Sequence, residues 1–293
     1  MSPHHAETSR SIRGEQCLER LDVSPVIAVA RPIVHRAAVV YLRHTAPWLV
    51  GLIVHGSALK GGFIPGCSDV DFQLFVDHDI LTHDGQLPLD IGIAVQRDLA
   101  HIDPAPFRFI QCKLASATGT QRIVGPVSGA YYVLAGRLPV PEATVEQLRN
   151  GAHHALAALD PVPAFMASSL LDHGGGPLAA DIRLLCTKVW PVLYQVLALQ
   201  QENAILVWRL PKGDAITHLP AGTELRRAMD IFYRAVQAYY PTEESIERAL
   251  DVVTSGVDAL RAAKEWWQEC RVPRVSNDYA SESVKNSANE RKK

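Results

Sequence analysis

The chain has 293 residues, of which 47% are hydrophobic and 20% are charged, so extended disorder and fibrous sequences are excluded. Its length allows one large domain or two of ordinary size. Lys and Arg number 29 against 31 Asp and Glu, a net charge of −2. This balance disfavours long nucleic acid as a partner, because such binding requires a basic surface that neutralises phosphates. A small or locally charged substrate fits better.

The five cysteines are widely spaced and form no C-x-x-C pair. An odd number of such residues favours free thiols in a reducing compartment over a disulfide framework or a zinc site. Residues 1–16 are polar and lack the apolar stretch of a secretory signal. The apolar segment 26–42 is interrupted by charged residues and does not fit a membrane span. We therefore expect a cytoplasmic protein with no membrane partner.

In the first half of the chain, apolar runs are short and turn residues are frequent. In chain order, the patterns predict a helix, two strands, a short helix and two further strands over residues 25–42, 48–55, 70–76, 90–100, 107–114 and 130–135. Pro32 is expected to kink the first helix. Alternation in the second strand places Asp69, Asp71 and Gln73 on the face opposite its apolar residues.

After residue 140 the strand signals stop. Apolar residues at helical spacing predict amphipathic helices over residues 145–159, 178–199, 225–239 and 242–267, with Thr242 as the cap of the last one. Helices joined by short loops form a bundle. The sequence therefore predicts an α+β fold: a mixed-sheet domain at 21–140, an α-helical bundle domain at 141–271, and disordered tails at 1–20 and 272–293.

The segment 55–76 carries the residues with the most chemical information. A buried strand ends in Gly56-Ser57, where a small residue lets backbone amides and a hydroxyl approach a ligand, as in phosphate-binding loops. Asp69 and Asp71 follow on one face of the next strand, where two bare carboxylates would repel each other. Such a pair suits Mg²⁺, which proteins hold with one or two carboxylates and substrate phosphates. Together these features predict phosphoryl or nucleotidyl transfer.

Gly56-Ser57, Gly61-Gly62, Pro65 and Ser68-Asp69-Val70-Asp71 together resemble the G-S…D-x-D signature of the DNA polymerase β-like nucleotidyltransferase superfamily. The combined form is similar to that of adenylyltransferases that modify aminoglycosides such as streptomycin and spectinomycin, with one additional residue here between the proline and the serine. The resemblance covers residues 48–76 and extends less specifically to the helical half. It implies a small mixed-sheet nucleotidyltransferase domain followed by a helical bundle that closes over nucleotide and acceptor.

The resemblance also implies roles for individual residues. Asp69 and Asp71 would be the catalytic residues and the Mg²⁺ ligands. ATP, as the substrate, would be bound by Gly56, Ser57, Lys60 and Ser68. For Lys60, a solvated loop lysine is the competing interpretation. The implied reaction moves AMP from ATP to a hydroxyl of a small molecule, with an aminoglycoside acceptor and a role in antibiotic resistance as the expectation.

The sequence departs from the family pattern at one position. The family places a third acidic residue on a later strand, but the matching strand at 107–114 contains no Asp or Glu. Arg108 or Gln111 takes that place, and Asp103 lies upstream of the strand. The general base of the reaction is therefore left open, with Asp103, a residue from the helical half, or water as alternatives.

This departure keeps a second hypothesis in view: a degenerate nucleotidyltransferase domain that binds nucleotide, with a regulatory or antitoxin-like role and no turnover. RNA-terminal nucleotidyl transfer shares the motif but is disfavoured by the balanced charge and the lack of a recognisable RNA-binding module. A cationic acceptor would require acidic residues on the bundle, for which Asp172, Asp181 and Asp214 are candidates.

Overall fold

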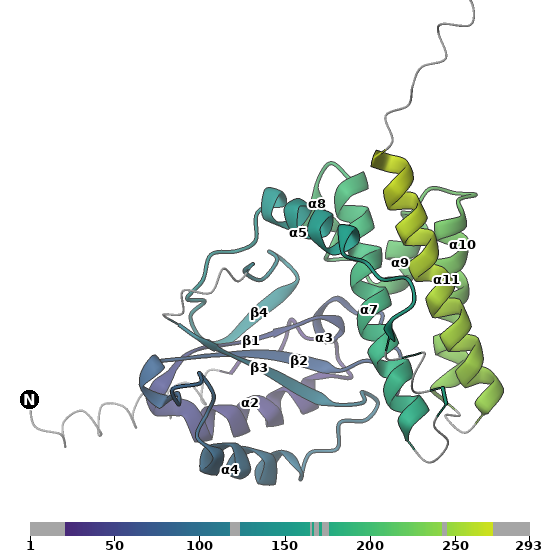
Figure 1. Ribbon diagram of the computed structural model, residues 1–293. Coiled ribbons are helices and arrows are strands. Elements are labelled where there is room, and N and C mark those ends of the chain that lie inside the picture. The colour runs from purple at the N-terminus through teal and green to yellow at the C-terminus, as the bar shows by residue number, and fades with distance from the viewer. Residues whose placement is uncertain are drawn as a thin grey trace, which may run out of the picture.

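The computed structural model describes residues 21–117, 124–164, 166, 170–171, 176–241 and 245–271. The tails expected to be disordered, at 1–20 and 272–293, lie outside these residues, as do Asp172 and the expected helix cap Thr242. Figure 1 shows a mixed sheet with long helices gathered beside one end of it. The α+β class predicted from the sequence is confirmed.

The sheet consists of four strands in the order β3-β2-β1-β4. Their bounds are β1 (Leu49–His55), β2 (Val70–Val76), β3 (Ile110–Ser116) and β4 (Tyr131–Gly136), each within a few residues of its expected range. β1 is antiparallel to both β2 and β4, whereas β2 and β3 are parallel. The parallel pair requires a crossover connection, and α4 (Leu89–Leu99) lies within it.

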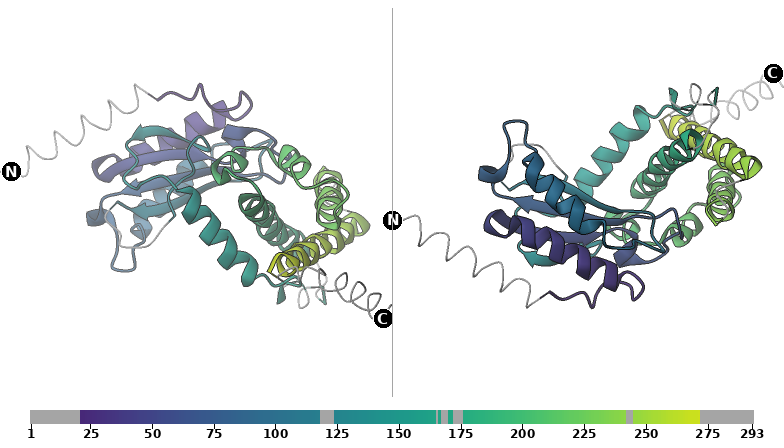
Figure 2. Two further views of the ribbon diagram at one scale, coloured as in Figure 1. Left: turned by 90° about the horizontal axis from the view of Figure 1, so that it is seen from above. Right: turned by 90° about the horizontal axis from the view of Figure 1, so that it is seen from below.

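One face of the sheet is covered by α2 (Arg31–Thr45) and α4, as both views in Figure 2 show. Val54, Phe72 and Leu74 belong to a core cluster that also contains the buried face of α2. The kink expected at Pro32 is wrong. Pro32 lies in the first turn of α2, where its missing N–H removes no helical hydrogen bond, so it begins the helix instead of bending it.

The second half of the described chain is helical and contains no sheet strand. Its helices are α5 (Val145–Ala157), α7 (Pro177–Gln200), α8 (Ala204–Val207), α9 (Lys212–Thr217), α10 (Glu224–Tyr239) and α11 (Ile246–Arg271). A separate core cluster joins them and also includes Ile64 and Cys67 from the loop before β2. The two halves therefore share packed residues at the end of the sheet that carries the Gly-Ser and Asp-x-Asp segment.

Among the described residues, α7 is the one helix long and apolar enough to cross a membrane. Of its most apolar window, 61% is buried inside the protein. Its buried residues, such as Leu185, Val189 and Leu193, pack in the bundle core. A core helix of a soluble protein has these properties, and this interpretation agrees with the expectation from the sequence.

Candidate functional site

A cleft of ≈ 350 Å³ lies where the sheet meets the helical half. The first half of the chain lines it with His55, Gly56, Ser57, Lys60, Cys67, Ser68, Asp69 and Asp71. The helical half lines it with Arg183, Cys186, Thr187, Trp190, Pro191, Tyr194, Trp208 and Lys212. All six residues predicted from the motif are therefore brought together in one cleft, and Figure 1 shows α3 (Ser57–Lys60) beside α7 and α9.

Gly56 is the turn between β1 and α3, and its conformation brings two parts of the site together. It has a φ of 74°, in the left-handed region that favours glycine. A Cβ atom at this position would lie 2.6 Å from Oδ2 of Asp71. The next residue, Ser57, is buried, and its hydroxyl lies 3.5 Å from the carbonyl oxygen of Asp69. The absence of a side chain at Gly56 thus allows Asp71 to approach the turn.

We expect Gly56→Ala to weaken nucleotide binding strongly and Gly61→Ala to leave it nearly unchanged. Gly61 has a similar φ of 78°, so an alanine strains the backbone at both positions by about 1 kcal/mol or more. At Gly61, however, an added Cβ would meet nothing within 4 Å. Urea unfolding and ATP titration of both variants would separate backbone strain from displacement of Asp71. Equal losses of affinity in the two variants would contradict this role of Gly56.

The two carboxylates have different surroundings. Oδ2 of Asp69 accepts a hydrogen bond from Nη2 of Arg183 at 2.7 Å, while its buried Oδ1 has no hydrogen-bond partner among the described residues. Burial, followed by the charge of Asp69, raises the pKa of Asp71 to about 6. Lys113, Lys212 and Arg183 act in the opposite direction.

These carboxylates fit a Mg²⁺ ion. Their oxygens are the hard ligands that Mg²⁺ prefers, and the unpartnered Oδ1 of Asp69 leaves a ligand position open. The described residues contain no group of three or more His, Cys, Asp or Glu side chains that would hold a metal without a substrate. The protein therefore offers a pair of carboxylates, as expected for an ion that also binds substrate phosphates.

Two partly buried lysines, Lys60 and Lys212, line the cleft. Nζ of Lys60 donates to the carbonyl oxygen of Trp208 at 3.1 Å and lies 4.0 Å from the ring centroid of Tyr194. Burial, followed by the charge of Lys212, lowers the pKa of Lys60 to about 7, against the opposing effect of Asp71. Burial also lowers the pKa of Lys212. Lysines with perturbed pKa values that share one cleft are typical of a functional site.

Aromatic side chains form part of the wall of the cleft. Tyr194 and Trp208 stack with ring centroids 5.2 Å apart. Trp190 packs against Phe232 in the bundle core, but it also lines the cleft. The indole N–H groups of Trp190 and Trp208 are buried and have no hydrogen-bond acceptor among the described residues. Such a wall can contact a base or sugar ring and donate hydrogen bonds to it.

The strand expected to carry the third acid places different residues near the carboxylates. Gln111 is the register partner of Asp71. Arg108 lies before β3. Because Val70 pairs with Ile110, Phe109 lies level with Asp69. The ring centroid of Phe109 is 4.1 Å from Cζ of Arg183, the residue that binds Asp69. Phe109 is thus a further candidate for the third position.

The acidic residues expected to meet a cationic acceptor do not line the cleft within the described part of the chain. Asp181 is only 8% exposed and lies in α7 among bundle residues. Asp214 is exposed on α9. Asp103 also lies outside the cleft, in a loop where its carboxylate accepts from the backbone N–H of Ala105. Arg183 and Lys212, by contrast, are cleft residues that no local sequence pattern predicted.

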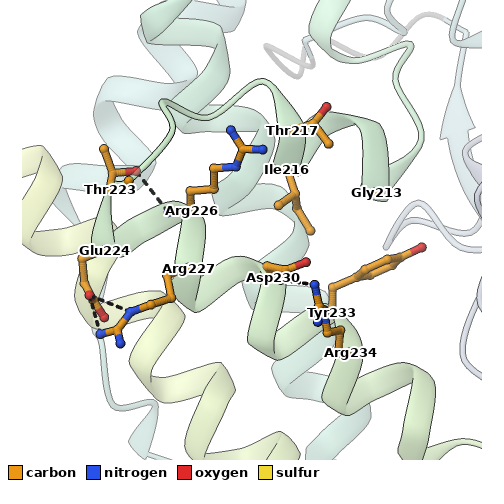
Figure 3. Close-up of a pocket in the computed structure, with 11 residues that line it drawn as sticks. Gly213, Ile216, Thr217, Thr223, Glu224, Arg226, Arg227, Asp230, Tyr233 and Arg234 are labelled. Carbon is orange, nitrogen blue, oxygen red and sulfur yellow. Dashed lines mark hydrogen bonds and ion pairs between the residues drawn. The ribbon is translucent and has the colours of Figure 1, made fainter.

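A second cavity, of ≈ 480 Å³, lies on the helical half between α9 and α10 (Figure 3). Its charged residues largely neutralise one another. Arg227 pairs with Glu224 at 2.6 Å and Arg234 pairs with Asp230 at 2.8 Å. Arg226 donates to a backbone carbonyl at 3.2 Å. Although this cavity is larger, the smaller cleft holds the partly buried carboxylates and lysines and is therefore the better candidate.

No protein-family model matches the chain, and no curated protein matches it at a significant level of similarity.

Proposed function

We propose that the protein is a Mg²⁺-dependent nucleotidyltransferase that moves AMP from ATP to a hydroxyl of a small molecule. The observation that supports this most directly is the composition of the cleft. The Gly56-Ser57 turn, the Asp69 and Asp71 carboxylates and two partly buried lysines line one cleft. Carboxylates and lysines in the same cleft suit a ligand that combines a divalent cation with several phosphates.

In this proposal each residue has a defined task. Ser57 and the Gly56 turn bind phosphate oxygens, and Lys60 and Lys212 offset their negative charge. Asp69 and Asp71 hold Mg²⁺, which when bound would align the triphosphate and stabilise the pyrophosphate leaving group. Oδ1 of Asp69 is free to bind the metal, whereas Oδ2 becomes a ligand only when Arg183 releases it. Trp190 and Trp208 are placed to contact the base or the acceptor.

The acceptor hydroxyl would enter from the open side of the cleft. An aminoglycoside remains the proposed acceptor class from the motif resemblance, and a cytoplasmic location, where ATP is present, is part of the same proposal. Because β3 carries no carboxylate, the acceptor proton would go to water or to a carboxylate outside the strand.

One observation favours the alternative of a nucleotide-binding domain without turnover. The Asp69–Arg183 ion pair places an internal cation on a proposed metal ligand, in a site that also lacks a carboxylate on β3. Such a domain would bind a nucleoside triphosphate and act through a regulatory or antitoxin-like contact.

The two functions are separated by measuring pyrophosphate release from each of the four nucleoside triphosphates with Mg²⁺, with and without a panel of aminoglycosides. Acceptor-dependent release would support the transferase. Tight Mg²⁺-ATP binding without release would support the inactive nucleotide-binding domain. Neither binding nor release would overturn both.

The lowered pKa of Lys60 predicts that ATP binding without Mg²⁺ weakens as the pH rises from 6 to 8.5. A triphosphate favours the charged lysine, which is present below the pKa of about 7 and must be reprotonated above it. The affinity should fall by up to about tenfold per pH unit above 7. Calorimetric titration of ATP into the wild type and into Lys60→Met would measure this fall in affinity. Because proton exchange by ATP itself contributes equally in both proteins, the difference between the two pH profiles is the contribution of Lys60. Identical pH profiles for the two proteins would show that Lys60 does not contact the phosphates.

A further inference from the structure

Two stretches of chain that each carry a cleft lysine pack directly against each other. Lys60 ends α3 and is followed by the Gly61-Gly62 turn, and Lys212 is the first residue of α9. A Cβ atom at Gly62 would lie 2.5 Å from Cβ of Pro211, 3.2 Å from its Cα and 3.4 Å from the backbone nitrogen of Lys212. The turn therefore approaches the start of α9 so closely that a side chain on Gly62 would collide with it.

Both lysines depend on the segment that leads into α9. Nζ of Lys60 donates to the carbonyl oxygen of Trp208 at 3.1 Å, four residues before Lys212 in the chain. Nζ of Lys212 lies 5.8 Å from the ring centroid of Trp190, and both lysines line the cleft. The separation of the two amino groups is therefore fixed where the Gly62 turn meets the start of α9.

The preceding glycine separates the effect of this contact from that of backbone conformation. Gly61 and Gly62 have φ values of 78° and 64°, so alanine strains the backbone at either position. A Cβ at Gly61 would meet no atom of the described residues within 4 Å, whereas one at Gly62 would meet Pro211. The Cβ of Pro211 belongs to a rigid ring and cannot rotate away. A side chain at Gly62 must therefore move the start of α9, and Lys212 with it.

We propose that Gly62 is a positioning residue that acts through Lys212: its contact with Pro211 holds the start of α9 where Lys60 and Lys212 bind one chain of linked phosphates together. The ligand class is a linear polyphosphate, which a nucleoside triphosphate carries. Two cations held at a fixed separation bind such a chain more tightly than two mobile ones, because less freedom is lost on binding. The effect on nucleotide rests on the proposed function; the placement of Lys212 by Gly62 does not.

The test is calorimetric titration of the full chain with sodium tripolyphosphate, which has neither base nor sugar, and with Mg²⁺-ATP. Gly62→Ala should weaken both by about tenfold or more, the loss expected for one charge-assisted contact. Gly61→Ala is the matched control and should stay within about twofold of the wild type. In a Lys212→Met background, Gly62→Ala should cause no further loss, because its effect passes through that lysine. A glycine with a merely structural role would give the same loss in both backgrounds.

Replacing the colliding atom provides a rescue. Pro211→Gly removes the Cβ that an alanine at position 62 would meet. In that background, Gly62→Ala should bind tripolyphosphate within about twofold of Pro211→Gly alone. If Gly62→Ala by itself does not fold, Pro211→Gly tests the contact from the other side. It should loosen the start of α9 and weaken binding, and this loss should disappear in the Lys212→Met background.

A second measurement reports the position of Lys212 without any nucleotide. Lysine acetylation by acetic anhydride, followed by mass spectrometry, should be faster at Lys212 in Gly62→Ala and unchanged in Gly61→Ala. Equal phosphate affinities in the two alanine variants, or a loss that persists undiminished with Lys212→Met, would overturn the inference. If the wild type binds neither tripolyphosphate nor Mg²⁺-ATP, the proposed function fails, and the acetylation rates still decide whether Gly62 positions Lys212.

Discussion

Replacing Asp71 with asparagine is expected to remove most of the gain in ATP affinity that Mg²⁺ provides and to lower any nucleotidyl transfer by about 10²- to 10³-fold. Asp71 lies next to the Gly56 turn, where only the absence of a side chain makes room for its carboxylate. An amide oxygen keeps the shape of that carboxylate but not its charge. The loss should therefore appear as lost metal dependence and not as lost folding.

The same substitution should raise the free energy of unfolding above pH 6. Burial raises the pKa of Asp71 to about 6 from an ordinary value of 3.8, so the folded protein disfavours the charged form. Above pH 6 the carboxylate is charged and its burial costs stability, whereas below about pH 4 it is protonated in both states and the cost disappears. Asp71→Asn removes this cost, and its stabilising effect should fade as the pH falls from 6 to 4.

Calorimetric titration of ATP with and without Mg²⁺, and urea unfolding at pH 4 and pH 7.5, would test both expectations. Asp90→Asn is the matched control, because Asp90 is an exposed carboxylate on α4, outside the cleft. It should change neither the metal dependence nor the pH profile of stability. Equal Mg²⁺ dependence in the wild type and Asp71→Asn would show that this carboxylate does not hold the metal.

The second large effect expected is a gain. Phe109→Glu should raise the rate of transfer to the correct acceptor by about 10²- to 10⁴-fold, the usual contribution of a general base. Position 109 lies level with Asp69, and its side chain already reaches Arg183. A glutamate there would pair with Arg183, release Asp69 toward the metal and provide a carboxylate that can accept the proton of the hydroxyl. Nucleotide affinity should change by less than the rate.

Two variants make this test selective. Phe109→Gln has the shape of the glutamate without its charge and should give no gain. Gln111→Glu places a carboxylate on the register partner of Asp71, and a larger gain there than at 109 would assign the third position to Gln111 instead. If the wild type already turns over at about 1 to 10³ per second, as enzymes typically do, and neither glutamate accelerates it, the base lies elsewhere.

The sequence by itself determined those features whose causes are local. The apolar run of β1 and the alternation in β2 follow from neighbouring residues, and both strands form where they were predicted. Asp69 and Asp71 share a face because side chains alternate along a strand. The Gly56-Ser57 turn could also be recognised locally, because its small residues directly follow the apolar run of β1. The kink predicted at Pro32 was wrong because a proline can either lie in the first turn of a helix or bend a helix that began earlier. The two cases differ only in where the helix begins, and α2 begins at Arg31.

The tertiary structure alone decided which side chains complete the cleft. Lys212, Arg183 and Cys186 come from helices more than a hundred residues beyond the motif, and each has an ordinary helical context in the sequence. Phe109 carries no chemical signal until the pairing of β2 with β3 places it beside Asp69. Local periodicity fixes the face of an element on which a residue lies. Its partners across the cleft depend on how the elements pack, because burial favours many pairings and steric fit selects one.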